Sequence, residues 1–179
     1  WITGRSGCGK STFLSMVAGI RPLEKGAIKL LVNNKNIKNE FIQNNIAYMP
    51  QNPIFHSTKI IDFISDGDTN LNLTRIKTIL KKLRITDSFG MNEENILDTI
   101  IGPRGYAPSG GQAKLLAFAR ALYKKNVYLY LLDEPTSDLN NELKELVLQN
   151  IFNISKEKFV LCITHDLKLI RSQDERIYL

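Results

Sequence analysis

The chain has 179 residues, of which 43% are hydrophobic and 23% are charged, enough for one domain with a buried core and unlike a disordered or fibrous chain. The net charge of +6 comes from scattered lysines and arginines, so we expect a solvated basic surface and no nucleic-acid partner. No apolar run approaches the about 20 residues of a membrane-spanning helix, and the spacing of Cys8 and Cys162 excludes a zinc site or a disulfide framework.

The first part of the chain has the pattern of a strand, a glycine-rich loop and a helix. The chain opens at Trp1, only two residues before the loop, so we expect the strand to start upstream and the domain to be truncated at its N-terminus. Gly19 is placed to end the helix. The elements expected here are a strand end at 1–2, a helix at 10–18 and short strands at 26–32 and 45–49.

The middle of the chain is mainly helical. Thr74 is placed to cap a helix with an apolar stripe at helical spacing. Ser109 precedes a helix over 111–124 that is apolar almost all round, so we expect it to be buried. The stripe of the first helix is formed by Ile76, Ile79, Leu80 and Leu83.

Strands and helices alternate in the last part. The apolar run 127–132 shows no alternation, which is typical of a strand covered on both faces. A helix over 141–152 and a buried strand over 159–163 follow. This alternation predicts an α/β fold with a mostly parallel sheet and helices on both faces.

The domain organisation follows from these patterns. We expect a single domain over 1–179, made of an α/β core at about 1–60 and 127–179 with an inserted helical subdomain at about 61–126.

A phosphate-binding loop is the first chemical motif. Residues 4–11, GRSGCGKS, fit the pattern G-x-x-x-x-G-K-[ST]. Its glycines let successive N–H groups converge on phosphate oxygens, and the helix that follows adds its positive end. Lys10 is expected to reach the β and γ phosphates and Ser11 to bind Mg²⁺. The expected nucleotide-binding residues are Gly4, Arg5, Ser6, Gly7, Cys8, Gly9, Lys10, Ser11 and Thr12.

Acidic and polar residues follow three predicted strands. Asp133 and Glu134 end an apolar strand, where ligands bind in open α/β sheets. There Asp133 can hold magnesium through water, and Glu134 can orient or deprotonate an attacking water. Gln51 offers a ligand to a water or a metal, and His165 a donor to a γ-phosphate oxygen. Taken singly, each of these last two residues is better explained without a function, Gln51 as a polar loop residue and His165 as a hydrogen-bonded residue at the end of a strand.

The order of these motifs resembles that of the ATP-binding-cassette (ABC) ATPases, over essentially the whole chain. The most specific element is Ser109-Gly110-Gly111-Gln112, followed after Asp133-Glu134 by Ser137-Asp138-Leu139-Asn140. The resemblance implies a P-loop NTPase (RecA-like) core that binds ATP and Mg²⁺. It also implies that the signature residues Ser109, Gly110, Gly111 and Gln112 bind ATP held by a second nucleotide-binding domain, in a homodimer or pseudo-dimer. The implied catalytic residues are Glu134, His165 and Gln51, and the implied metal ligands are Ser11, Gln51 and Asp133.

Two positions depart from the family pattern. Pro108 replaces the usual apolar first residue of the signature, and Asn140 replaces a usual aspartate at the expected dimer interface. These departures leave open a weakly hydrolysing, regulatory cassette.

Two segments are similar to exporter-type cassettes, at residues 51–64 and 98–105, whereas 133–137 and 164–166 have an importer character. We expect the energy module of an exporter, with an importer subunit as the alternative. A chromosome-maintenance ATPase is excluded because no heptad run separates Gln51 from Ser109. The expected membrane partner is a transmembrane domain fused upstream, and the expected location is the cytoplasmic face of the inner membrane.

Overall fold

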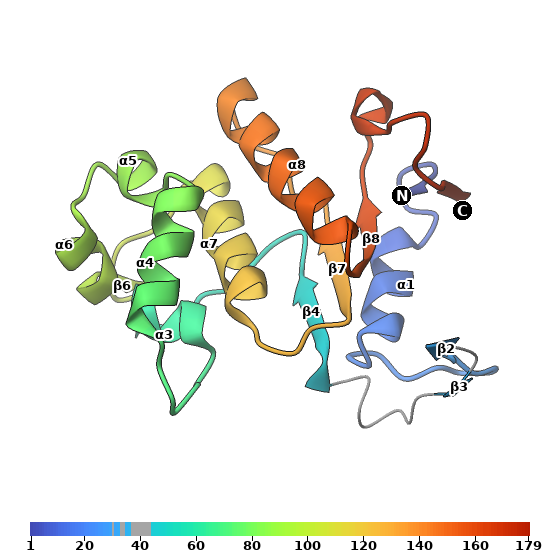
Figure 1. The fold of residues 1–179 in the computed structure, drawn as a ribbon, viewed down its shortest axis with the longest axis horizontal. Coiled ribbons are helices and arrows are strands. Elements are labelled where there is room, and N and C mark those ends of the chain that lie inside the picture. Colours follow the sequence, from blue (N-terminus) through green and yellow to red (C-terminus); the bar gives the residue numbers. More distant parts are fainter. Residues whose placement is uncertain (30, 33–34, 37–43) are drawn as a thin grey trace.

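A parallel sheet forms the centre of the computed structural model, which describes residues 1–29, 31–32, 35–36 and 44–179 (Figure 1). The sheet has five strands in the order β4-β7-β8-β1-β9, and every neighbouring pair is parallel. The predicted α/β fold with a mostly parallel sheet is confirmed. The strands are β1 (Ile2–Thr3), β4 (Ile46–Met49), β7 (Leu129–Asp133), β8 (Phe159–Ile163) and β9 (Ile177–Tyr178).

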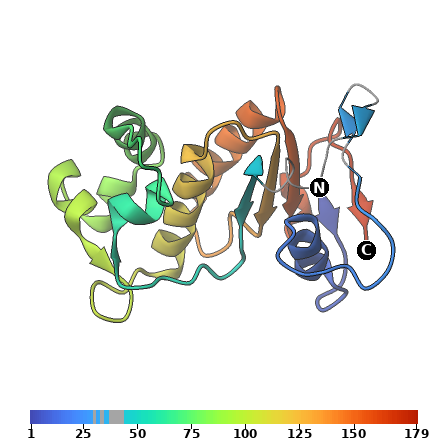
Figure 2. The same ribbon diagram turned by 90° about the horizontal axis from the view of Figure 1, so that it is seen from below.

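Different helices cover the two faces of this sheet (Figure 2). Leu129 and Leu131 of β7 belong to the apolar cluster that contains Leu14 of α1 (Lys10–Val17). Tyr130 and Leu132 belong to the cluster built with α8 (Asn141–Ser155) and the helices of the middle segment. All residues of β7 are therefore buried, as its unbroken apolar run predicts.

The middle segment forms five helices on one side of the molecule (Figure 1, green to yellow). They are α3 (Ile60–Ser65), α4 (Leu73–Lys82), α5 (Ile85–Phe89), α6 (Glu93–Asp98) and α7 (Gly110–Tyr123). A small antiparallel sheet of β5 (Thr58–Lys59) and β6 (Ile100–Ile101) accompanies them. The predicted stripe of α4 is buried, and α7 packs against α3, α4 and β4, so its predicted burial is confirmed.

The start of α4 differs from the prediction. Asn72, not Thr74, is the N-cap, and its side-chain oxygen accepts a hydrogen bond from the main-chain N–H of Arg75 at 2.9 Å. Asn72 is held there because its own N–H donates to the hydroxyl of Tyr123, a residue of α7 distant in the sequence.

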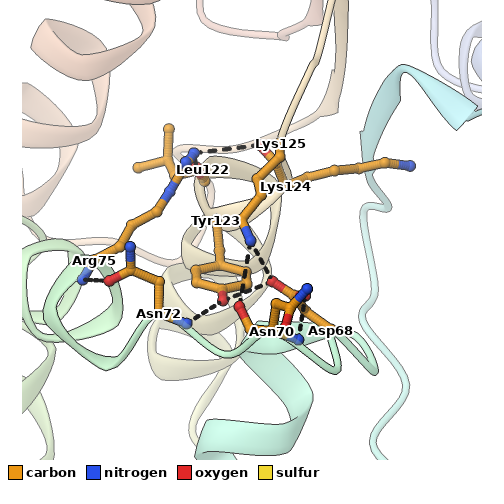
Figure 3. A network of polar contacts seen from close by, with 8 residues as sticks. All are labelled: Asp68, Asn70, Asn72, Arg75, Leu122, Tyr123, Lys124 and Lys125. Atoms are coloured by element: carbon orange, nitrogen blue, oxygen red, sulfur yellow. Dashed lines mark hydrogen bonds and ion pairs between the residues drawn. The ribbon is translucent and has the colours of Figure 1, made fainter.

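A polar network joins the loop before α4 to the end of α7 (Figure 3). The Tyr123 hydroxyl donates to Asp68 Oδ2 at 2.9 Å, and Lys125 Nζ lies 2.8 Å from the same oxygen. The Arg75 guanidinium donates to a main-chain carbonyl at the end of α7 at 3.0 Å, where the helix leaves its carbonyls unpaired. These contacts hold the α3–α4 connection against the helix that begins at the signature residues.

The remaining elements are short. β2 (Leu31–Val32) and β3 (Lys35–Asn36) pair antiparallel. The sequence predicts a strand at 26–32. Of this segment, residues 31–32 form β2, residues 27–29 belong to no strand, and residue 30 lies outside the described residues. A 3₁₀ turn, η1 (Leu167–Leu169), follows β8. Within the described part of the chain, no helix has both the length and the apolar character needed to span a bilayer.

Candidate functional site

Four parallel strands end side by side and bring most of the predicted residues to one edge of the sheet. β4 leads to Gln51, β7 ends in Asp133 and Glu134, β8 leads to His165, and β1 leads into the glycine-rich loop at Gly4. The strands pair directly in the order β4-β7-β8-β1. Residues from four distant parts of the sequence therefore meet where open α/β sheets bind ligands.

The glycine-rich loop adopts a backbone conformation that residues with a side chain rarely adopt. Gly7 and Gly9 have φ of 78° and 99°, in the left-handed region that favours glycine. A Cβ atom at either position would meet no atom within 4 Å, so backbone conformation and not crowding requires glycine there. Gly9 precedes α1, whose first N–H groups receive no side-chain cap. This uncapped helix start is a suitable anion site.

Lys10 lies folded over this loop. It is 6% exposed, and its Nζ donates to the main-chain oxygens of Gly4 at 3.1 Å and Arg5 at 2.9 Å. Carbonyl oxygens are modest partners for a buried ammonium, and phosphate oxygens are stronger ones. The Lys10 side chain is thus placed beside the loop that would hold a phosphate.

Asp133 and Ser11 form a pair of oxygen ligands next to the loop. Asp133 is 1% exposed, and its Oδ1 makes no hydrogen bond within the described residues. Burial raises the pKa of this carboxyl, while a hydrogen bond from Ser11 and the charges of Lys114 and Lys10 lower it. Carboxylate and hydroxyl oxygens are the ligands that Mg²⁺ prefers. In the described part of the chain, no group of three or more acidic, His or Cys side chains is arranged to hold a metal ion, so a metal here would need phosphate oxygens in addition to protein ligands.

Glu134 has the strained backbone typical of functional residues. Its φ is 51° although it is not glycine, and it is only 7% exposed. Its Oε1 lies 3.4 Å from His165 Nε2 without a hydrogen bond of good geometry. Burial raises the pKa of Glu134, His165 lowers it and Asp133 raises it further. A buried carboxylate with a raised pKa is suited to accept a proton from water.

The signature residues begin α7. Ser109 is the N-cap, and a capping box pairs its side chain with Gln112 N–H at 3.3 Å while Gln112 Oε1 accepts from Ser109 N–H at 2.9 Å. A Cβ atom on Gly111 would lie 2.8 Å from the main-chain oxygen of Asp138, and one on Gly110 would lie 3.2 Å from the Asp138 Cβ. The glycines therefore let the Asp138 turn pack against the start of the helix.

The signature and the phosphate loop are not joined in this chain. Among the described residues, no hydrogen bond connects Ser109 or Gln112 to the loop; the Gln112 amide instead donates to the Ser88 carbonyl at 2.8 Å. Lys114 is a further residue of this region that the sequence motifs do not include; it is 3% exposed and donates to the main-chain oxygen of Gln51. The available signal was a charged residue within an otherwise apolar, buried helix.

Comparisons with known proteins agree with this geometry. The ABC transporter family profile matches residues 1–137. Multidrug resistance protein pgp-1 of Caenorhabditis elegans is 34% identical over 97% of this chain and 13% of its own length. A putative export ATP-binding/permease protein of Rickettsia felis is 36% identical over 97% of this chain and 30% of its own. The solved structure of a bacterial Atm1-family ABC exporter with ATP bound has a TM-score of 0.84 and 25% identity, and covers 99% of this chain and 31% of that chain.

The chain belongs to the ABC transporter family. The resemblance to ABC ATPases, the P-loop NTPase fold and the exporter-type character expected from sequence are confirmed. The matched region is an ATP-binding, ATP-hydrolysing cassette of the kind that powers ABC exporters. The chain spans only 13% and 30% of the length of the two curated relatives.

Proposed function

We propose that this chain hydrolyses ATP in a nucleotide-sandwich dimer and so powers an exporter. The proposal rests on the positions of the residues at the edge of the sheet where β7 and β8 end. There Glu134, which directly follows Asp133, has a buried carboxylate whose Oε1 lies 3.4 Å from His165 Nε2 and makes no hydrogen bond within the described residues. A base, a donor and a metal-binding carboxylate are the groups that phosphoryl transfer to water requires.

In this proposal, each part of the reaction is carried out by a different residue of the chain. Lys10 exchanges its carbonyl partners for the β and γ phosphates, and the loop N–H groups hold phosphate oxygens. Glu134 accepts the proton of the attacking water as the new oxygen–phosphorus bond forms and the bond to the β-phosphate oxygen breaks. His165 donates to a γ-phosphate oxygen. Mg²⁺, when bound, neutralises phosphate charge. Ser11, Gln51 and Asp133 are the residues that would hold it.

The partners follow from the same proposal. A second nucleotide-binding domain supplies a signature to each ATP, and a transmembrane domain, fused upstream, uses the closure of the dimer at the cytoplasmic face of the membrane. We also propose that the cassette divides into a core at 1–60 and 127–179 and a helical subdomain at 61–126. Helices α3 to α7 lie together on one side of the molecule, apart from the other helices that cover the five-stranded sheet, and this grouping supports the division (Figure 1).

Two observations favour hydrolysis over a merely regulatory role. The capping box at Ser109 forms although Pro108 precedes it. Asn140 caps α8 by accepting from Leu143 N–H at 2.9 Å, which asparagine does as well as aspartate. Both departures from the family pattern therefore leave the local backbone well formed.

Substitution of the proposed base tests the function. Glu134→Gln should retain ATP binding and lower turnover by about 10²–10⁴-fold, because the amide cannot accept the proton. The matched control is Glu145→Gln, on an exposed position of α8, which should hydrolyse at the parent rate. Phosphate release and equilibrium nucleotide binding are measured on both. Parent-rate hydrolysis by Glu134→Gln would contradict the mechanism.

A further inference from the structure

Lys114 is a buried cation without a role in the mechanism above. It lies in the second turn of α7, is 3% exposed, and donates from Nζ to the main-chain oxygen of Gln51. Burying an ammonium is costly unless it is paired. The burial of a lysine side chain among apolar residues of a helix therefore requires an explanation other than packing.

The charges around Lys114 all belong to the candidate site. Burial lowers the pKa of Lys114, and the negative charges of Asp138, Asp133 and Glu134 offset part of this effect by raising it. These three residues come from the end of β7 and from the turn that packs against the signature glycines. The Lys114 side chain thus joins α7 to the Gln51 segment through a hydrogen bond and interacts electrostatically with the acidic residues of the site.

Lys114 also lies close to the signature along its own helix. It lies five positions after Ser109, or about 7.5 Å along a helix axis. A rigid helix transmits a displacement of its first turn to its second. Any movement of the signature is therefore passed to the group that holds the carbonyl of Gln51.

We propose that Lys114 is a positioning residue that ties the Gln51 segment to the signature helix, so that contact of the signature with a partner's ATP sets the geometry of this chain's own site. The inference rests on the proposed function, because it assumes that Gln51 serves the bound nucleotide and that the signature acts on a second cassette. Lys114 touches neither nucleotide nor metal in this scheme; it acts through the main chain of Gln51.

Three substitutions of Lys114 separate positioning from packing. Lys114→Met keeps length and volume but removes charge and donor, and Lys114→Gln keeps a donor that is shorter and neutral. Both should lower kcat by about 10- to 100-fold with KM for ATP within about twofold, because misplacement affects the reacting geometry more than binding. Lys114→Arg keeps the charge and a donor of similar reach and should restore part of kcat, because its planar guanidinium directs the donors differently. Lys124→Met, at the far end of α7, is the matched control and should behave as the parent.

The melting temperature distinguishes the two roles. Removing the cation leaves neighbouring carboxylates without it, so Lys114→Met should melt below the parent but well above the assay temperature, where a fall in kcat then reports on positioning and not on unfolding. If Lys114→Met does not fold, Lys114→Gln provides the same test. Parent kcat in either folded variant overturns the inference, as does a loss that Lys114→Arg fails to restore. Glu134→Gln, measured in parallel, reports separately on the proposed mechanism, because parent-rate hydrolysis by that variant shows that Glu134 is not the base, whereas a parent protein that does not hydrolyse ATP overturns the proposed function itself.

Discussion

The Nε2 atom of His165 lies 3.4 Å from Oε1 of Glu134, although the two residues follow different strands. The pairing of β7 with β8, in which Asp133 is opposite Ile163, produces this contact. The Glu134 side chain is 10% exposed and the His165 side chain 53%, so the carboxylate is sheltered while the imidazole faces the open edge. This arrangement supports the proposed role of His165, whose imidazole lies beside the proposed base and remains accessible from solvent.

We predict that His165→Ala lowers kcat by about 10²–10³-fold, the usual effect of removing a donor to the transition state. ATP binding should persist, because Lys10 and the loop hold the phosphates. The chain has one other histidine, the exposed His56, and His56→Ala is the matched control. Phosphate release and nucleotide binding are measured on both variants. Equal turnover of the two would show that His165 has no part in hydrolysis.

Much of the fold and the site could be predicted because both depend on local patterns. The unbroken apolar run of β7 indicated a strand buried on both faces, and the spacing of Gly4, Lys10 and Ser11 indicated a phosphate loop. Parallel strands all end at one edge, so residues that follow strands could be placed together without knowledge of the strand order.

The rest depended on contacts between distant segments. Asn72 and Thr74 are both good helix caps, and the hydroxyl of Tyr123, which holds the Asn72 N–H, decides between them. Burial of Lys114 could have been predicted from the apolar character of α7, but its partner could not, because the carbonyl of Gln51 leaves no side-chain signature. The Asp138 turn against the signature glycines is likewise a backbone contact.

The polar network at the end of α7 leads to a prediction on pH (Figure 3). Hydrogen bonds from Lys125, Tyr123 and the Asn70 N–H lower the pKa of Asp68. A lowered folded pKa gives stability that is present above the unfolded carboxyl pKa of about 3.9 and is lost as pH falls through the folded value. Asp68→Asn should therefore melt below the parent at pH 7, and this difference should shrink once the pH falls below about 4.

Thermal unfolding across this pH range checks the prediction. Asp87→Asn, on an exposed position of α5, is the control and should show a smaller difference at pH 7. A difference between the parent and Asp68→Asn that stays constant from pH 7 to pH 3 would mean that the charge of Asp68 adds nothing to the network.

The last prediction concerns the partner of the signature. In the described residues the signature helix makes no hydrogen bond to the phosphate loop of its own chain. Its N-terminus can serve only a phosphate toward which it points. A two-fold pair satisfies this requirement with one self-complementary surface, with each ATP between Lys10 of one chain and Ser109 of the other.

Ser109→Arg should therefore leave ATP binding by the monomer nearly intact and abolish ATP-dependent dimerisation and hydrolysis. Because Ser109 also caps α7, its loss costs about 1 kcal/mol of stability. Asn92→Ala removes a comparable cap from α6 and controls for that loss. Light scattering with ATP is measured on the Glu134→Gln background, with and without Ser109→Arg.

Mixing variants gives the sharper result. In a heterodimer of Ser109→Arg and Lys10→Ala chains, one composite site carries both lesions and the other carries neither. Hydrolysis should then return in the mixture, although neither variant is active alone, because the intact site has Lys10 from one chain and Ser109 from the other. If Ser109→Arg instead destroys ATP binding in the isolated monomer, the signature acts on its own chain's nucleotide, and the sandwich arrangement is wrong.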